Sequence, residues 1–111
     1  MDRMNLVIIN DVMGRAKKNS LKNKYGVGCA GKEHYSAEYV RASAMFRLMN
    51  HGTMIFKSID GNVLELGGYS RSDMSAIDSA MSFVGFNGRV LSNKPKVEPF
   101  KEMNGWFIVP R

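Results

Sequence analysis

One stretch, residues 52–84, constrains the fold of this chain more than any other. It reads GTMIFKSIDGNVLELGGYSRSDMSAIDSAMSFV. The segment Thr53–Ile59 is rich in β-branched and aromatic residues, and Asn62–Leu66 alternates between apolar and polar residues. Asp60-Gly61 lies between them, and a type I′ turn needs positive φ at both central positions, which this pair tolerates. The stretch therefore predicts a two-stranded hairpin that Gly67-Gly68 ends.

A helix is predicted directly after this hairpin, over about residues 71–84. Ser70 and Asp73 have the spacing of a capping box, in which each side chain binds the backbone N–H of the other residue. Gly85 is suited to the left-handed conformation that stops a helix. The apolar residues fall on one helical stripe: Met74, Ile77, Met81 and Val84.

The N-terminal residues 2–17 also predict a helix, with Asp2 as its cap and Gly14 as its stop. Its helical spacing rests on Met4, Val7, Ile8 and Val12. An alternative is a short strand over residues 5–10, because the run NLVIIN is equally compatible with a buried strand.

Two interpretations are open for residues 36–50. Their propensity favours a helix, whereas the alternative is a hairpin with strands at 38–41 and 44–49. Further on, a strand is predicted at 89–92, followed by a polar loop and a hairpin that turns at Asn104-Gly105. The last strand, 106–109, would close the sheet under the helix. A chain of 111 residues has room for one core, so we expect a single α+β domain: an antiparallel sheet of about five strands packed by one central helix, with an N-terminal helix and a basic connector.

The net charge of +6 is concentrated in one segment, residues 15–32, which has six cations and no acid. A local excess of this kind implies an anionic partner more than a uniformly basic surface would. Leu21 and Tyr25 are the only sizeable apolar residues of 15–31, which predicts a mobile basic connector. Tyr25 or Tyr35 could stack on an unpaired base. The candidate binding residues are Arg15, Lys17, Lys18, Lys22, Lys24, Tyr25 and Lys32.

The sequence predicts no metal and no cofactor. Cys29 is the single cysteine and is expected to be a small buried thiol, and His34 and His51 do not have zinc-ligand spacing. The run GVGCAG matches G-x-G-x-x-G, but no apolar strand precedes it, so a flexible turn is favoured over a phosphate loop. Apolar runs are too short for a membrane span and no secretory signal is recognised, so a reducing cytoplasm is expected.

Residues 39–109 carry a pattern of turns, glycines and aromatic residues. A strand that ends near a His or Asn leads to a Thr-containing strand, a D-G turn, a strand that ends in GG plus an aromatic, a Ser/Thr-rich helix start and a final hairpin that ends in an aromatic pair. The residues that carry it are His51, Thr53, Asp60-Gly61, Gly67-Gly68-Tyr69, Ser70, Ser72, Arg89, Trp106 and Val109. This pattern resembles small phage-encoded proteins of unknown function. The resemblance implies a sheet-plus-helix architecture, favours the hairpin over the helix for residues 36–50, and brings no catalytic motif.

The functional hypothesis is a non-enzymatic binding protein. Asp60 is expected in a turn, and Ser70, Ser72 and Asp73 at a helix cap, so no catalytic constellation forms. A small phage protein of this kind would dock on a host or phage protein, with an edge of the terminal hairpin able to recruit a partner strand, and could inhibit a nucleic-acid-handling enzyme. The alternative is a protein that binds nucleic acid through residues 15–32 without sequence specificity.

Overall fold

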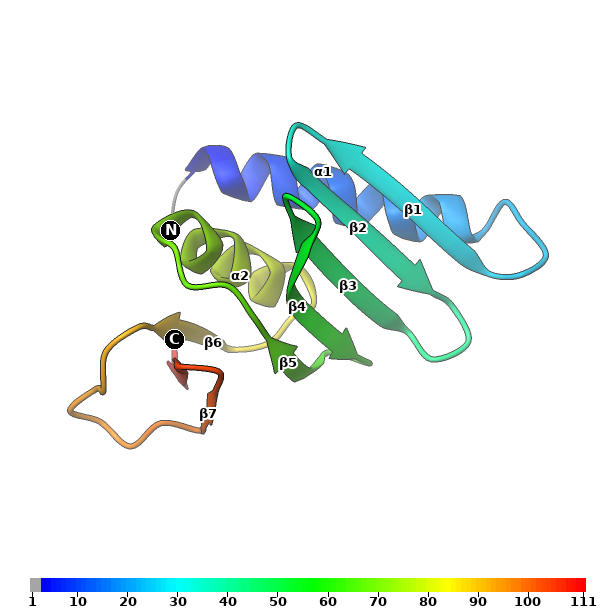
Figure 1. Ribbon diagram of the computed structural model, residues 1–111. Helices are drawn as coiled ribbons and strands as arrows, with labels where there is room; N and C mark the ends of the chain where they lie inside the picture. The colour runs from blue at the N-terminus through cyan, green and yellow to red at the C-terminus, as the bar shows by residue number, and fades with distance from the viewer. Residues whose placement is uncertain (1–2) are drawn as a thin grey trace.

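The computed structural model, which describes residues 3–111, has an α+β fold of two helices and two antiparallel sheets (Figure 1). The helices are α1 (Arg3–Ser20) and α2 (Arg71–Phe83). The five-stranded sheet is a meander of β1 (Val27–Lys32), β2 (Tyr35–Val40), β3 (Met45–Asn50), β4 (Thr53–Ile59) and β5 (Asn62–Leu66). The three-stranded sheet has the order β6 (Gly88–Leu91), β8 (Trp106–Pro110), β7 (Lys101–Met103). The predicted fold class is confirmed.

The hairpin and helix of residues 52–84 form as predicted. Asp60 and Gly61 have φ values of 51° and 81°, as the tight turn between β4 and β5 requires. At the start of α2 both bonds of the capping box between Ser70 and Asp73 are present. Gly85, with φ of 81°, follows the last turn of the helix.

Residues 36–50 form the hairpin of β2 and β3, so the helical interpretation is wrong. Burial alternates along both strands: Tyr35, Ala37 and Tyr39 are buried on β2, and Phe46 and Leu48 on β3. This period of two places all five side chains on the face that the helices cover. Packing against α1 and α2 therefore outweighs the helical propensity of the segment.

Helix α1 is longer than predicted, and the alternative strand over residues 5–10 is wrong. The helix passes through Gly14 and ends at Ser20, because its buried stripe continues beyond Gly14 to Ala16 and Ser20. Val7 is 57% exposed and lies off this stripe. The Asp2 cap and the Met4 side chain lie outside the part of the chain that the structure describes.

The terminal hairpin of β7 and β8 forms as predicted but does not extend the main sheet. It pairs with β6 instead, and two side-chain bonds attach it to the end of β5. The amide of Asn104 donates to the Leu66 carbonyl at 2.6 Å, and the indole N–H of Trp106 donates to the Gly67 carbonyl at 2.9 Å. Within residues 3–111, neither helix is long and apolar enough to cross a membrane.

Candidate functional site

The basic segment 15–32 has regular structure, so the prediction of a connector is wrong. Its residues form the end of α1, a turn, and the whole of β1, and Figure 1 shows α1 and β1 side by side, running in opposite directions. The prediction of a connector rested on the small number of large apolar residues in this segment. The segment is held in place by the pairing of β1 with β2, by buried Ala16 and by polar side chains that bind backbone groups.

Three side chains, here called the edge ladder, bind consecutive outward carbonyls of β1. Arg15 donates to Gly31 at 2.8 Å, Asn19 donates to Cys29 at 2.9 Å, and Asn23 donates to Val27 at 2.6 Å. Four residues of helix rise about 6 Å and two residues of strand about 6.6 Å, so Arg15 and Asn19 stay in step with their acceptors, and Asn23 continues the series from the turn after the helix. The edge ladder occupies backbone acceptors that an edge strand otherwise offers to another chain.

The middle glycine of the G-x-G-x-x-G run, Gly28, serves this packing of helix on strand. A Cβ atom at Gly28 would lie 1.9 Å from the Ala16 carbonyl oxygen and 2.3 Å from the Ser20 nitrogen. The backbone of α1 can therefore lie against β1 only where β1 has no side chain. Both the flexible turn and the phosphate loop are wrong for this run, because it is a strand of the sheet.

The structure separates the six predicted cations into distinct environments. Arg15 belongs to the edge ladder and forms an ion pair with Asp11 at 2.8 Å, and its hydrogen bonds lower the pKa of that carboxyl. Lys17 lies over the ring of Tyr39, 5.8 Å from its centroid. Lys32 ends β1 and lies about 17 Å along the strand from Val27. Only Lys18, Lys22 and Lys24 remain together at the α1–β1 turn.

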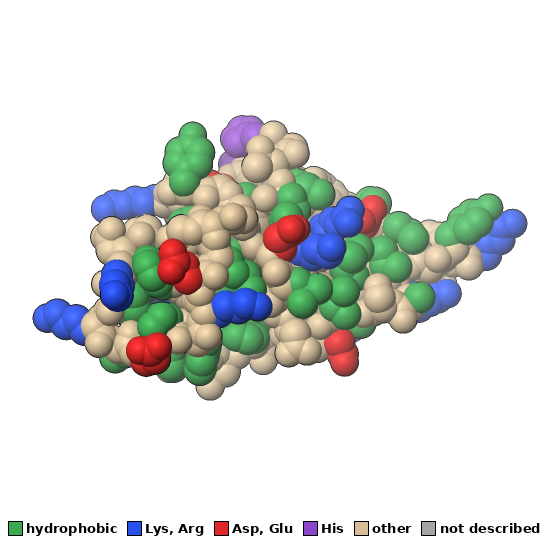
Figure 2. All heavy atoms as spheres, turned by 60° about the horizontal axis from the view of Figure 1, so that its bottom comes forward, with side chains coloured by type: hydrophobic (Ala, Val, Ile, Leu, Met, Phe, Trp, Pro, Cys, Tyr) green, Lys and Arg blue, Asp and Glu red, His purple; other side chains and the backbone are tan. Residues whose placement is uncertain are grey.

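These three lysines, with Leu21 and Tyr25, form a projecting end of the molecule that we call the tip. Leu21 is 66% exposed and Tyr25 is 77% exposed, and the Lys24 ammonium lies 5.3 Å from the centroid of the Tyr25 ring. Figure 2 shows hydrophobic and basic side chains projecting together at this end. Tyr35, the other predicted stacking residue, is only 2% exposed and is not available. The tip thus presents apolar and cationic groups without an acid in its own segment.

A second polar cluster, which the sequence interpretation missed, joins the β1–β2 turn to α2. His34 Nδ1 and Asn50 Oδ1 lie 2.5 Å apart, and the Asn50 amide donates to Asp73 Oδ1 at 2.7 Å. Because that amide nitrogen faces Asp73, the Asn50 oxygen accepts and His34 Nδ1 carries the proton. The ring of His51 stacks on His34 at 4.4 Å. No local motif signals the cluster, because its members come from the β1–β2 turn, the end of β3 with the turn that follows it, and helix α2.

The carboxylate of Asp73 is the centre of this cluster. Burial raises its pKa, but hydrogen bonds from Asn50 and from the backbone of Ser70 and Tyr69 outweigh burial and lower it. The groove beside the histidines measures about 640 Å³ and also contains Asp78, whose pKa is raised by burial. Among residues 3–111 no group of three metal-ligating side chains is found. The cluster fastens α2 to the sheet.

The prediction that Cys29 is buried is wrong, since its thiol is exposed on the face of the sheet away from the helices.

The chain matches no protein-family model, and no curated protein or solved structure matches it.

Proposed function

We propose that this chain is a non-enzymatic, phage-encoded binding protein that docks through its tip on an acidic surface of a host or phage protein. The observation that carries the proposal is the exposure of Leu21 and Tyr25 among three lysines at a projecting end of the fold. Aromatic anchors ringed by polar groups are typical of protein interfaces, and surrounding charges speed the encounter. If the acidic surface is the working surface of a nucleic-acid-handling enzyme, docking there inhibits that enzyme.

The roles of the titratable groups support a binding function over a catalytic one. Asp73 caps a helix, Asp11 pairs with Arg15, and Asp78 accepts a hydrogen bond from the Val90 backbone at 2.8 Å. Each of these carboxylates therefore has a structural partner. General acid–base chemistry needs such groups to converge on a reacting atom instead.

The second candidate function is binding of single-stranded nucleic acid at the same tip. Tyr25 offers an exposed ring for stacking, and the lysines offer contacts to phosphate. Leu21 distinguishes the two candidates. An aliphatic side chain contributes to a protein interface but has little to offer a phosphate backbone, so its 66% exposure favours the protein partner.

The test is a pull-down from host lysate, with and without nuclease, using three variants. In the first, Lys18, Lys22 and Lys24 are replaced by Gln. In the second, Leu21→Ser removes only the aliphatic anchor. The control replaces Lys94, Lys96 and Lys101 by Gln, which removes the same charge from exposed positions in another part of the chain. We expect captured protein to survive nuclease, to be lost from both tip variants and to persist with the control.

Other outcomes decide between the candidates. Loss of the captured partners on nuclease treatment, together with retention of binding by Leu21→Ser, would establish nucleic acid as the ligand. Equal loss from the tip variant and from the control would show that net charge alone drives association, which contradicts a docking role for the tip.

A further inference from the structure

The five-stranded sheet has a second face, the open face, which neither helix covers. Alternation along the strands places Glu38, Arg47 and Lys57 on this face, because their neighbours Ala37, Leu48 and Phe56 are buried on the helical side. Soluble sheets of this kind commonly have one solvated face.

A row of four charged residues crosses the middle of the open face. The strand register places Glu38 opposite Arg47, Arg47 opposite Lys57, and Lys57 opposite Glu65. Arg47 and Glu38 form an ion pair at 3.7 Å, whereas Lys57 has no ion pair within residues 3–111. Two cations directly opposite each other on neighbouring strands destabilise a sheet. Glu38 and Glu65 at the two ends of the row offset this repulsion, but the Arg47–Lys57 pair itself adds no stability to the isolated sheet.

Apolar side chains lie on both sides of the central cations. Val40, Met45 and Ile59 form the next cross-strand row on one side, and Met49 faces Met54 on the other. All five side chains are half-buried. Methionine adapts its shape to a partner surface more readily than branched residues do. Apolar side chains, three of them methionines, therefore flank the two cations Arg47 and Lys57 on the open face.

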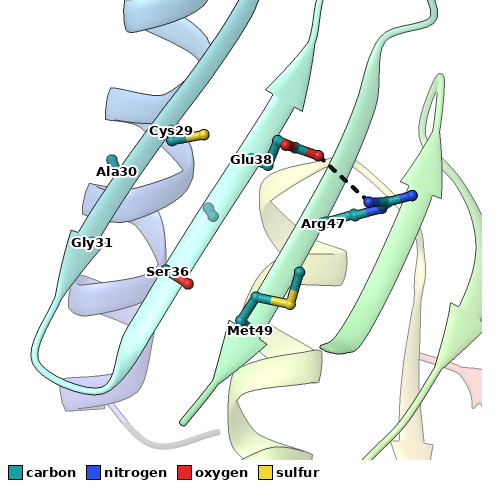
Figure 3. A pocket seen from close by; sticks show the side chains of 8 residues that line it. Cys29, Ala30, Gly31, Ser36, Glu38, Arg47 and Met49 are labelled. Carbon is teal, nitrogen blue, oxygen red and sulfur yellow. Dashed lines mark ion pairs between the residues drawn. The ribbon is translucent and has the colours of Figure 1, made fainter. Parts of the chain in front are cut away.

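A depression of about 460 Å³ adjoins Arg47 on the open face (Figure 3). Small residues form its floor, since Cys29, Gly31 and Ser36 lie on the neighbouring strands β1 and β2. Met49 and the Glu38–Arg47 pair stand beside it. The volume is sufficient for one large apolar side chain of a partner, and Arg47 lies at its rim.

A second copy of this chain is a poor occupant of the open face when the two rows are docked centre to centre. In a two-fold dimer of facing sheets whose axis crosses the middle of the row, the centre of the row meets the centre of the same row. Arg47 and Lys57 of one copy would then face Arg47 and Lys57 of the other. Like charges brought together in an interface cost several kcal/mol. The complementary partner carries the opposite charge at its centre.

We infer that the open face docks on a partner protein that presents a carboxylate side chain next to a bulky apolar one. The carboxylate lies between Arg47 and Lys57, and the apolar side chain fills the depression above Cys29. The hydrogen-bonding fork of an arginine suits a carboxylate, and the lysine adds a second charge. This surface is separate from the tip and would serve a second protein contact.

The test uses a displayed library of random twelve-residue peptides, selected on the wild-type protein and counter-selected on the double variant Arg47→Gln/Lys57→Gln. We expect the recovered peptides to share an Asp or Glu next to an aromatic or large aliphatic residue. Synthetic versions should bind the wild type at least about tenfold more tightly than the double variant. Lys22→Gln/Lys24→Gln at the tip is the matched control, and it should bind these peptides as the wild type does.

The single cysteine gives an independent readout on the unmodified protein. A bound peptide should slow the reaction of Cys29 with N-ethylmaleimide, and prior modification of Cys29 should abolish peptide binding. This measurement keeps the test decisive if the double variant is unstable. The inference is overturned if no peptide is selected, if the selected peptides lack an acid, if they leave Cys29 unprotected, or if the wild type alone sediments as a dimer.

Discussion

The edge ladder and the tip come from the same basic segment but have opposite roles. Arg15, Asn19 and Asn23 bind carbonyls of β1 within 3 Å. Lys18 and Lys22, one step away along the chain, have exposed side chains. Within α1 the difference follows from position on the helix, because Arg15 and Asn19 are four residues apart and share a face that Lys18 does not. Beyond the helix end, the turn keeps Asn23 on the β1 side. One side of the segment builds the fold, and the other remains available to a partner.

This contrast shows that a charge excess in the sequence is not a charged patch on the surface. The sequence has six cations between residues 15 and 32, but three of them have positions or partners elsewhere. The tip keeps half of the charge and gains two exposed apolar groups. The expected flexible cationic arm is therefore a compact surface of lysine and apolar side chains in the structure.

The largest expected effect is that of Gly28→Ala, on the structural side of the comparison. The added methyl group would collide with the backbone of α1 at 1.9 Å, and backbone cannot move aside as a side chain end can. We expect a loss of about 3 kcal/mol in the free energy of unfolding. Urea titration followed by the fluorescence of Trp106 measures it.

Gly31→Ala on the same strand is the control for this substitution. A Cβ atom there would make ordinary contacts, the nearest at 3.5 Å to the Tyr35 carbonyl oxygen. Its free energy of unfolding should stay within about 1 kcal/mol of the wild type. If both substitutions cost the same, close approach of α1 is not the reason for glycine at position 28.

Asp73→Ala extends the comparison to α2, where a side chain again binds backbone groups. The variant loses the bonds to Ser70 and Tyr69 and leaves the amide of buried Asn50 without its acceptor. We expect a cost of about 2 kcal/mol. Helix content by circular dichroism and urea titration at pH 7 measure it, with Ser72→Ala as the control at the exposed neighbouring position.

The lowered pKa of Asp73 determines how its contribution to the free energy of unfolding changes with pH. The pKa of Asp73 is lowered in the folded state, so its contribution is present above the unfolded value of about 3.9 and is lost as pH falls through the folded value. Asp78 acts in the opposite direction, because its raised pKa favours proton uptake by the folded state. The difference in unfolding free energy between wild type and Asp73→Ala should therefore shrink below about pH 4, and a constant difference would contradict the assignment.

Asn19→Ala, in the middle of the edge ladder, should have a smaller effect. It removes one hydrogen bond to a strand carbonyl that water can replace at the exposed edge. The expected cost is about 1 kcal/mol. The adjacent Lys18→Ala should change the unfolding free energy by less than about 0.5 kcal/mol. Equal costs for the two variants would remove the distinction between the two sides of α1.

Much of the fold could be predicted because its signals are local. The turn at Asp60-Gly61, the cap at Ser70 and the turn at Asn104-Gly105 each specify backbone conformation within a few residues. The edge ladder could not be found this way. Arg15 and Gly31 are sixteen residues apart, and their bond exists only once α1 lies against β1. Gly28 gave a misleading signal, since glycine suits a loop and a tightly packed strand equally.

Part of the candidate site could also be predicted, because the residues concerned are neighbours in the sequence. Lys22, Lys24 and Tyr25 lie in a turn, where local reasoning from composition is sound, and they remain together in the structure. Lys32 was assigned to the same site by sequence distance, but the extended strand carries it away. The row of Glu38, Arg47, Lys57 and Glu65 depends on the register of four strands, which no local pattern in the chain specifies.

The smallest expected effect on stability is at the tip, where the comparison is tested most directly. Replacing Lys22, Lys24 and Tyr25 together by Ala removes exposed side chains, of which Lys24 lies over the Tyr25 ring. Surface changes of this kind alter stability by less than about 0.5 kcal/mol each. Binding of the partner captured by the wild type should nevertheless fall at least about tenfold, because an aromatic anchor and two cations are lost at once. Urea titration and surface plasmon resonance on the same preparation measure both quantities. A variant that unfolds more easily and still binds would show that the tip, like the edge ladder, is part of the scaffold.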